Sequence, residues 1–267
     1  MERVTEQLQQ EINRVVLGKE QIVRKVLLAI LAQGHVLLED VPGVGKTTLA
    51  KAFSKTLGLT SRRIQFTPDT MPSDIIGFSV FDKSTGALKY QPGAIMTNLV
   101  LADEINRTSS KTQSALLEAM EEMQVTVDGV THPLPAPFVV LATQNPVGSA
   151  GTQMLPPSQM DRFLIKLSMG YPDRASTAAL LKDRHHADPL DVCRTVTDPA
   201  SLEKSIGEAM SVFVADRIYD YIAELVEATR NNAYVTLGVS PRGALAVSRA
   251  AKANAYLEGR NYVIPDD

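Results

Sequence analysis

The sequence predicts an α/β fold in which helices cover both faces of a parallel sheet, followed by a small all-helical region. Through residue 172, short apolar runs alternate with segments of helical hydrophobic spacing, which is the pattern of a parallel αβα sheet. One apolar run leads into a glycine-containing loop at residues 40–45. Beyond residue 172 the apolar residues follow helical spacing alone. We therefore expect a sheet core over residues 1–172 and a helical lid over residues 173–267.

Residues 37–50, LLEDVPGVGKTTLA, have the order that a phosphate-binding P-loop requires: an apolar strand, a glycine loop and a helix. Glycines let backbone N–H groups turn toward phosphate oxygens, and the following helix directs its positive end at the same anion. Lys46 would bind the β- and γ-phosphates of ATP, and the Thr47 hydroxyl would ligate Mg²⁺. The predicted nucleotide-binding residues of this loop are Pro42, Gly43, Val44, Gly45, Lys46, Thr47 and Thr48.

The loop departs at one position from the usual pattern, G-x-x-x-x-G-K-[ST]. Asp40 stands where the first glycine is expected, and a carboxylate beside phosphates lowers the specificity of the match. An ordinary strand–helix turn with an exposed lysine is therefore the structural alternative for this segment.

A second apolar run, NLVLADE at residues 98–104, ends in two carboxylates. A buried parallel strand is hydrophobic throughout, and ligands bind beyond the carboxyl ends of such strands. Asp103 is therefore expected beside Thr47, where both residues would ligate Mg²⁺. Glu104 is placed to orient or deprotonate a water molecule that attacks the γ-phosphate. The alternative is a strand that ends in solvated acids.

The remaining elements follow from local patterns. Helical spacing predicts helices over residues 5–16, 22–32, 46–57, 109–124, 175–184, 214–230 and 241–257, with a loop between 184 and 214. Further strands are expected at 35–39, 63–67, 139–141 and 163–167. Residues 78–90 and 125–131 read as hairpins, the second with Asp128-Gly129 as a type I′ turn. The inward face of helix 109–124 would carry Leu116, Leu117, Met120 and Met123. Residues 263–267 look like the start of another helix, so we expect a lid that is truncated at its C-terminus.

Four segments resemble motifs of the MoxR family of AAA+ ATPases, in the order of that family. They are residues 103–107 (DEINR), 141–146 (LATQNP), 155–163 (LPPSQMDRF) and 240–242 (SPR). The resemblance covers nearly the whole chain. It implies a P-loop AAA+ αβα core with two β-hairpin insertions and a small helical lid, with ATP and Mg²⁺ as cofactors.

The resemblance also implies roles for individual residues. Asn145 is similar to the sensor 1 residue that places the attacking water, and Arg162 to an arginine finger that completes the site of a neighbouring subunit. Arg242 resembles sensor 2, which reaches from the lid to the γ-phosphate, and Arg107 is a further candidate for an intersubunit contact. The turn that packs against adenine is matched by Val16, Leu17 and Gly18.

Each of these residues also has a structural interpretation. Asn145 precedes a proline and would start a turn, whereas Arg162 beside Asp161 would form a surface ion pair. Ser240 and Pro241 have the order of a helix N-cap and first turn, which explains the neighbourhood of Arg242 without a ligand.

Composition excludes several classes of protein. The chain of 267 residues has a formal net charge of −3 and only two short basic clusters, Arg62-Arg63 and 184–186, which argues against a dedicated nucleic-acid binder. The single cysteine, Cys193, excludes an intramolecular disulfide, and there is no zinc-type Cys/His cluster. Neither a signal peptide nor an apolar stretch of about 20 residues is present, so we expect a cytoplasmic protein. His35 is expected to be structural.

We therefore expect an ATPase subunit that remodels client protein complexes. If Arg162 is a finger, no subunit holds a complete site, so a ring is expected; the resemblance implies a hexamer and a partner with a von Willebrand factor A domain. A DNA-working motor is disfavoured because the hairpin tips carry Asp128-Gly129 and only one lysine, Lys83. A chelatase-type motor and a nucleotide-sensing scaffold with little turnover remain alternatives, the latter because of Asp40.

Overall fold

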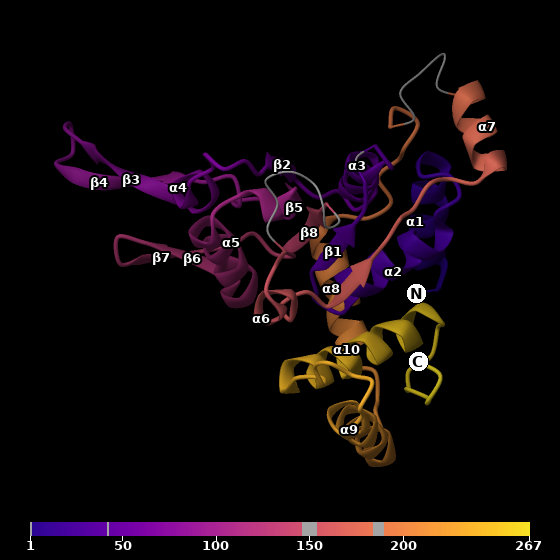
Figure 1. Ribbon diagram of the computed structural model, residues 1–267. Helices are drawn as coiled ribbons and strands as arrows, with labels where there is room; N and C mark the ends of the chain where they lie inside the picture. Colours follow the sequence, from indigo (N-terminus) through magenta and orange to yellow (C-terminus); the bar gives the residue numbers. More distant parts are fainter. Residues whose placement is uncertain (1, 42, 146–153, 184–189) are drawn as a thin grey trace.

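The computed structural model describes residues 2–41, 43–145, 154–183 and 190–267, and a five-stranded sheet lies at its centre (Figure 1). All neighbouring strands are parallel, in the order β2-β5-β8-β1-β9. This order confirms the predicted parallel α/β core. The strands are β1 (Val36–Glu39), β2 (Ser61–Gln65), β5 (Leu99–Asp103), β8 (Val139–Gln144) and β9 (Ile165–Leu167).

Hydrophobic cores cover both faces of this sheet. Side chains alternate along each strand, so Val100 belongs to one core cluster whereas Leu99 and Leu101 belong to the other. The first cluster includes α5 (Ser110–Glu122). The second cluster includes the helices α1 (Glu2–Val15), α2 (Glu20–Leu31) and α3 (Lys46–Thr56). Both faces being covered explains why β5 and β8 are buried along their whole length.

Two hairpins extend from the core toward the same side of the molecule (Figure 1). The first joins β3 (Gly77–Asp82) to β4 (Ala87–Pro92) and follows the short helix α4 (Pro72–Ile76). The second joins β6 (Gln124–Val127) to β7 (Val130–Pro133), through a turn in which both residues have positive φ, as predicted. The Tyr90 and His132 rings stack with centroids 3.8 Å apart, which connects the two hairpins.

The C-terminal part is helical, as predicted, but it contains a helix that the sequence analysis missed. We expected a loop between 184 and 214, whereas α8 (Pro199–Met210) lies there. Its start has a clear signal, because the Asp198 carboxylate accepts a hydrogen bond of 3.0 Å from Ser201 N and Pro199 occupies the first turn. Helix α8 packs on α2 and on α10, and thereby joins the C-terminal helices to the core. The others are α7 (Arg174–Asp183), α9 (Asp216–Arg230) and α10 (Pro241–Leu257).

The predicted inward orientation of Met123 is also wrong. It was expected to face inward from helix 109–124, but α5 ends at Glu122 and the Met123 side chain is 38% exposed. Its φ of 52° turns the chain out of the helix and into β6, so its side chain leaves the apolar face. Three short helices, α4, η1 (Ile105–Arg107) and α6 (Pro157–Met160), were also not predicted. In the described residues, no helix combines the length and hydropathy needed to cross a membrane.

His35 connects three elements of the core. Its Nε2 lies 3.0 Å from the carbonyl oxygen of Met120 in α5, and its Nδ1 accepts a hydrogen bond of 3.1 Å from Val140 N in β8. This pair of contacts requires a neutral ring that carries its proton on Nε2. Burial lowers the pKa of His35 to about 4.

We predict that His35 makes the protein less stable as pH falls from 6.5 to 4. The unfolded chain binds a proton near pH 6.5 and the folded chain only near pH 4, so between these values unfolding takes up a proton. The expected loss in free energy of unfolding between pH 7 and pH 5 is about 2 kcal/mol, measured by urea denaturation. His35→Gln should remove this pH-dependent loss in the free energy of unfolding, whereas the control His132→Gln should keep it. An unchanged pH dependence in His35→Gln would contradict the assignment.

Candidate nucleotide site

Polar side chains meet at the carboxyl ends of the three central strands. Asp103 ends β5 and Glu104 follows it, Asn145 follows β8, and Asp40 follows β1. Because β1, β5 and β8 are parallel neighbours, these ends lie along one edge of the sheet. The loop between β1 and α3 leaves from the same edge.

The glycine loop has a backbone that favours glycine and open space in front of it. Gly43 and Gly45 have φ values of 88° and 97°, and a Cβ added at either would meet no atom within 4 Å. Gly45 is the N-cap of α3 and offers no side chain to the first N–H groups of that helix, which remain available to an anion. Val44 is buried, Thr47 and Thr48 are partly exposed in the first turn of α3, and Pro42 lies outside the described residues.

The Lys46 ammonium lies among the acidic residues of this edge. Its Nζ donates a hydrogen bond of 3.0 Å to the backbone oxygen of Asp40. Burial lowers the pKa of Lys46, and the charges of Asp103, Asp40 and Glu104 oppose that shift. A buried cation beside an open glycine loop has the chemistry needed to bind phosphate oxygens.

The Asp40 carboxylate is hydrogen-bonded to a neighbouring segment of the chain. It accepts hydrogen bonds from Ser168 Oγ (3.0 Å), from Met169 N and from Gly170 N (3.1 Å), all just after β9. Asp40, at the end of β1, therefore anchors the segment that follows the neighbouring strand β9. The backbone oxygen of Asp40, not its carboxylate, contacts Lys46, although the charge of the carboxylate still acts on the Lys46 ammonium.

Asp103 is held by two residues that the sequence analysis did not identify. Thr143 Oγ1 donates to Asp103 Oδ1 at 2.6 Å and accepts from Glu104 N at 2.8 Å, so one hydroxyl positions both acidic residues. Arg63 Nη2 donates to Asp103 Oδ2 at 2.7 Å from the neighbouring strand β2. Thr143 gave a usable signal, since it is the first polar residue after the apolar run of β8.

The site fits Mg²⁺ only together with a bound nucleotide. In the part of the chain that the structure describes, no group of three or more His, Cys, Asp or Glu residues could hold a metal ion. Thr47 and Asp103 offer one hydroxyl and one carboxylate, and Mg²⁺ in phosphate sites is commonly held by one or two protein oxygens, by phosphate oxygens and by water. Thr47 and Asp103 as ligands of Mg²⁺ therefore stay a prediction.

Glu104 occupies a strained backbone conformation. Its φ of 59° lies in the left-handed region, which is uncommon for a residue with a side chain and is frequent at functional sites. Arg107 Nη1 donates to its carboxylate at 2.8 Å and Asn145 Nδ2 at 3.2 Å. The ion pair with Arg107, followed by the hydrogen bond from Asn145, lowers the pKa of Glu104. A carboxylate with a lowered pKa is a weak base and is better suited to orienting a water molecule.

Asn145 and Arg107 thus both act on Glu104 within one chain. The Arg107 guanidinium contacts Glu104 of its own chain, and the expected intersubunit contact of Arg107 stays a prediction. Asn145 Oδ1 is buried and has no hydrogen-bond partner among the residues described, so it can accept a hydrogen bond from a water molecule.

The turn expected to contact adenine lies beside the segment that Asp40 anchors. Val16 is buried and Leu17 is partly exposed. Gly18 has a φ of 68°, and a Cβ there would lie 2.3 Å from Ser176 Oγ of α7. The next residue, Lys19, donates from Nζ to the backbone oxygens of Met169 (2.5 Å) and Tyr171 (3.0 Å). Residues 168–171 are therefore held from two sides, by the P-loop and by this turn.

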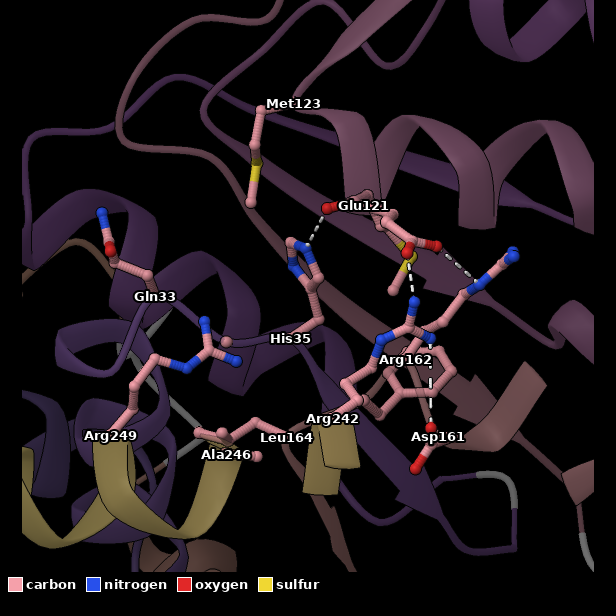
Figure 2. A pocket seen from close by; sticks show the side chains of 13 residues that line it. Gln33, His35, Glu121, Met123, Asp161, Arg162, Leu164, Arg242, Ala246 and Arg249 are labelled. Atoms are coloured by element: carbon pink, nitrogen blue, oxygen red, sulfur yellow. Dashed lines mark hydrogen bonds and ion pairs between the residues drawn. The ribbon is translucent and has the colours of Figure 1, made fainter. Parts of the chain in front are cut away.

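Arg162 and Arg242 lie together, at the opposite edge of the sheet (Figure 2). Both contact Glu121 in the last turn of α5 and line a cavity with His35, which precedes β1. The glycine loop follows the other end of β1, a strand of four residues, so at least roughly 13 Å of strand separate this cavity from the loop. The structure therefore places Arg242 beside Arg162 and not over the glycine loop of its own chain.

Comparison with known proteins agrees with this geometry. Residues 35–165 match the family of ATPases associated with various cellular activities (AAA), and residues 227–267 match the AAA lid domain. The chain is 52% identical over 258 residues to the protein YeaC of Bacillus subtilis, covering 97% of this chain and 81% of YeaC. It is 39% identical over 266 residues to chaperone MoxR1 of Mycobacterium tuberculosis, covering 96% and 70%.

Two further relatives extend the comparison. Protein MoxR of Methylorubrum extorquens is 30% identical over 289 residues, covering 97% of this chain and 82% of that protein. A crystal structure from Cytophaga hutchinsonii, solved as a candidate ATPase, superposes with a TM-score of 0.88 at 36% identity and covers 99% of this chain and 83% of that one.

We predict that Asp40→Gly, which creates the usual loop pattern, weakens the protein. The substitution leaves the N–H groups of Met169 and Gly170 without their acceptor, so the free energy of unfolding should fall by at least about 2 kcal/mol. ATP affinity, measured with a fluorescent analogue, should fall as well because the loop loses its anchor. The isosteric control Asp40→Asn should lose less stability. Tighter ATP binding by Asp40→Gly at unchanged stability would show that the carboxylate does oppose phosphate.

Proposed function

Because this chain belongs to the MoxR family of AAA+ ATPases, we propose that it hydrolyses ATP to ADP and phosphate and uses this reaction to remodel client protein complexes. The observation that carries the proposal is the convergence of Lys46, Asp103 and Glu104 in front of an open glycine loop. The same edge of the sheet carries Asn145, which contacts Glu104.

Each residue of this edge has a role in hydrolysis. The N–H groups of the glycine loop and Lys46 would bind the phosphates, and Thr47 and Asp103 would hold Mg²⁺, which neutralises charge on the phosphates when bound. Glu104 would orient the attacking water, with Asn145 fixing both the carboxylate and the water. Arg107 and Asn145 hold the Glu104 carboxylate, and the lowered pKa keeps it ionised.

Arg162 and Arg242 would act on the nucleotide of a neighbouring subunit. They lie at the edge of the sheet opposite to their own glycine loop, so a second copy must bring its nucleotide to them. Such cations stabilise the negative charge that develops on the transferred phosphoryl group. We therefore propose a ring, and the family favours a hexamer.

The projecting hairpins favour a protein client over DNA. Phe78, Phe81 and Leu88 on the β3–β4 hairpin are 52%, 59% and 63% exposed. A hairpin that tracks nucleic acid would present basic residues to phosphates, whereas exposed apolar side chains suit contact with polypeptide. The named relative MoxR1 is a chaperone, and the family implies a partner with a von Willebrand factor A domain. We propose both the client and this partner for the present chain.

We predict that Glu104→Gln binds ATP but loses turnover by at least ~100-fold, since the amide keeps the shape without the carboxylate charge. Lys46→Ala should abolish binding because the triphosphate loses its main counter-charge. Phosphate release and equilibrium binding measure the two effects, with Glu203→Gln on the exposed face of α8 as the control for the chemical change. Turnover of Glu104→Gln within a few-fold of wild type would make Glu104 a structural residue.

We predict that Arg162→Ala subunits bind ATP normally yet hydrolyse it poorly, and that mixing them with Glu104→Gln subunits restores part of the activity. In mixed rings some interfaces join an intact Glu104 to an intact Arg162, which rebuilds a complete site. Native mass spectrometry confirms mixed rings. The absence of recovery in confirmed mixed rings would contradict action across the interface.

A further inference from the structure

One carboxylate joins the two arginines at the far edge of the sheet. Glu121 Oε1 accepts a hydrogen bond from Arg242 Nη2, and Glu121 Oε2 lies 3.1 Å from Arg162 Nε (Figure 2). Arg162 comes from the segment before β9, Arg242 from the start of α10, and Glu121 from the end of α5. Glu121 is thus the point at which the sheet core and the helical region bring their cations together.

A second contact fixes the backbone that carries Arg242. Ser240, the N-cap of α10, donates from Oγ to both carboxylate oxygens of Asp161 (2.8 and 2.9 Å) and accepts from Gly243 N (2.9 Å). Asp161 is adjacent in sequence to Arg162, so the start of α10 is attached to the residue beside the candidate finger. The two backbones are therefore placed independently of Glu121, which acts on the two side chains.

The ion pair with Glu121 involves Nε of Arg162, which makes no hydrogen bond there, and does not involve the terminal Nη groups. The Nη groups of an arginine can bind a planar anion or a phosphate with two parallel hydrogen bonds. All three side chains are partly exposed, at 29% for Arg162, 36% for Glu121 and 40% for Arg242. They are accessible to an incoming ligand.

The cavity beside this cluster has an excess of positive charge. Its volume is about 210 Å³, and three guanidinium groups line it, from Arg162, Arg242 and Arg249, against the carboxylates of Glu121 and Asp161. Without Glu121 the neighbouring cations would repel each other and both long side chains would sample many rotamers. A negatively charged ligand would balance the remaining positive charge of this cavity.

We propose that Glu121 is a positioning residue for catalysis in the neighbouring subunit: it holds Arg162 and Arg242 as one pair that receives the phosphates of a nucleotide bound by a second copy of this chain. The inference rests on the proposed ATPase function. Glu121 needs no contact with the nucleotide in this arrangement. It orders the two cations before the second copy arrives, so that less conformational freedom is lost when the site forms.

The test compares Glu121→Gln and Glu121→Ala with Glu203→Gln, the same chemical change on the exposed face of α8. Both Glu121 variants should bind ATP as wild type does, because their own glycine loop lies at the other edge of the sheet. Their turnover should fall by about ten-fold or more at saturating ATP, since small displacements of catalytic groups have effects of this size. Glu203→Gln should be unaffected. Thermal unfolding and ring formation are measured on every variant.

Complementation in mixed rings decides which side of the interface Glu121 serves. Glu121→Ala mixed with Glu104→Gln should regain activity, whereas Glu121→Ala mixed with Arg162→Ala should not, because no interface then has an intact cation pair. The reverse pattern would place Glu121 in its own subunit's site and overturn the proposal. Wild-type turnover by folded, ring-forming Glu121→Gln and Glu121→Ala would also overturn it.

Failure of this proposal is separable from failure of the proposed function. If Arg162→Ala and Glu104→Gln complement each other but Glu121→Ala complements neither while still folding and forming rings, the ATPase ring stands and the positioning role is wrong. If wild-type protein fails to hydrolyse ATP with Mg²⁺, the proposed function itself is wrong.

Discussion

Parallel pairing of β1 with β8 and of β8 with β5 is the constraint on which the rest of the structure depends. It places the carboxyl ends of the strands at one edge of the sheet and their amino ends at the other. Residues that are far apart in sequence therefore become neighbours without further contacts. The same pairing separates functions. Groups that follow the strands can act on a nucleotide in the same chain, while groups that precede the strands, such as Arg162, face away from it. The sheet therefore keeps Arg162 and Arg242 apart from the glycine loop of their own chain.

Buried charge explains much of the local detail. A carboxylate taken out of water needs hydrogen bonds or a cation, and each acidic residue of the site has them. Asp103 has Thr143 and Arg63, Glu104 has Asn145 and Arg107, and Asp40 has backbone N–H groups. These partners fix the orientation of the acids relative to the loop. Rigid placement of this kind reduces the reorganisation needed when the reaction begins.

The sequence predicted the sheet, the hairpins and most helices because their signals are local. Apolar runs specify buried strands, and Ser240-Pro241 marks the first residue of α10. The same reasoning missed α8 because a loop was expected over its N-cap. Asp198-Pro199 is nevertheless a typical signal for the start of a helix. The pairing of Arg162 with Arg242 through Glu121 could not be predicted, since it joins three distant segments by tertiary packing alone. The contacts of the Asp40 carboxylate could not be predicted either, because they also join segments that are distant in the sequence.

The double attachment of residues 168–171 has a mechanical consequence. Asp40 fixes their N–H groups to the start of the glycine loop, and Lys19 fixes their carbonyl oxygens to the turn after α1. A peptide segment that is hydrogen-bonded on both sides has little conformational freedom. Any displacement of the loop, whatever its origin, would be passed directly to the backbone that leads into α7.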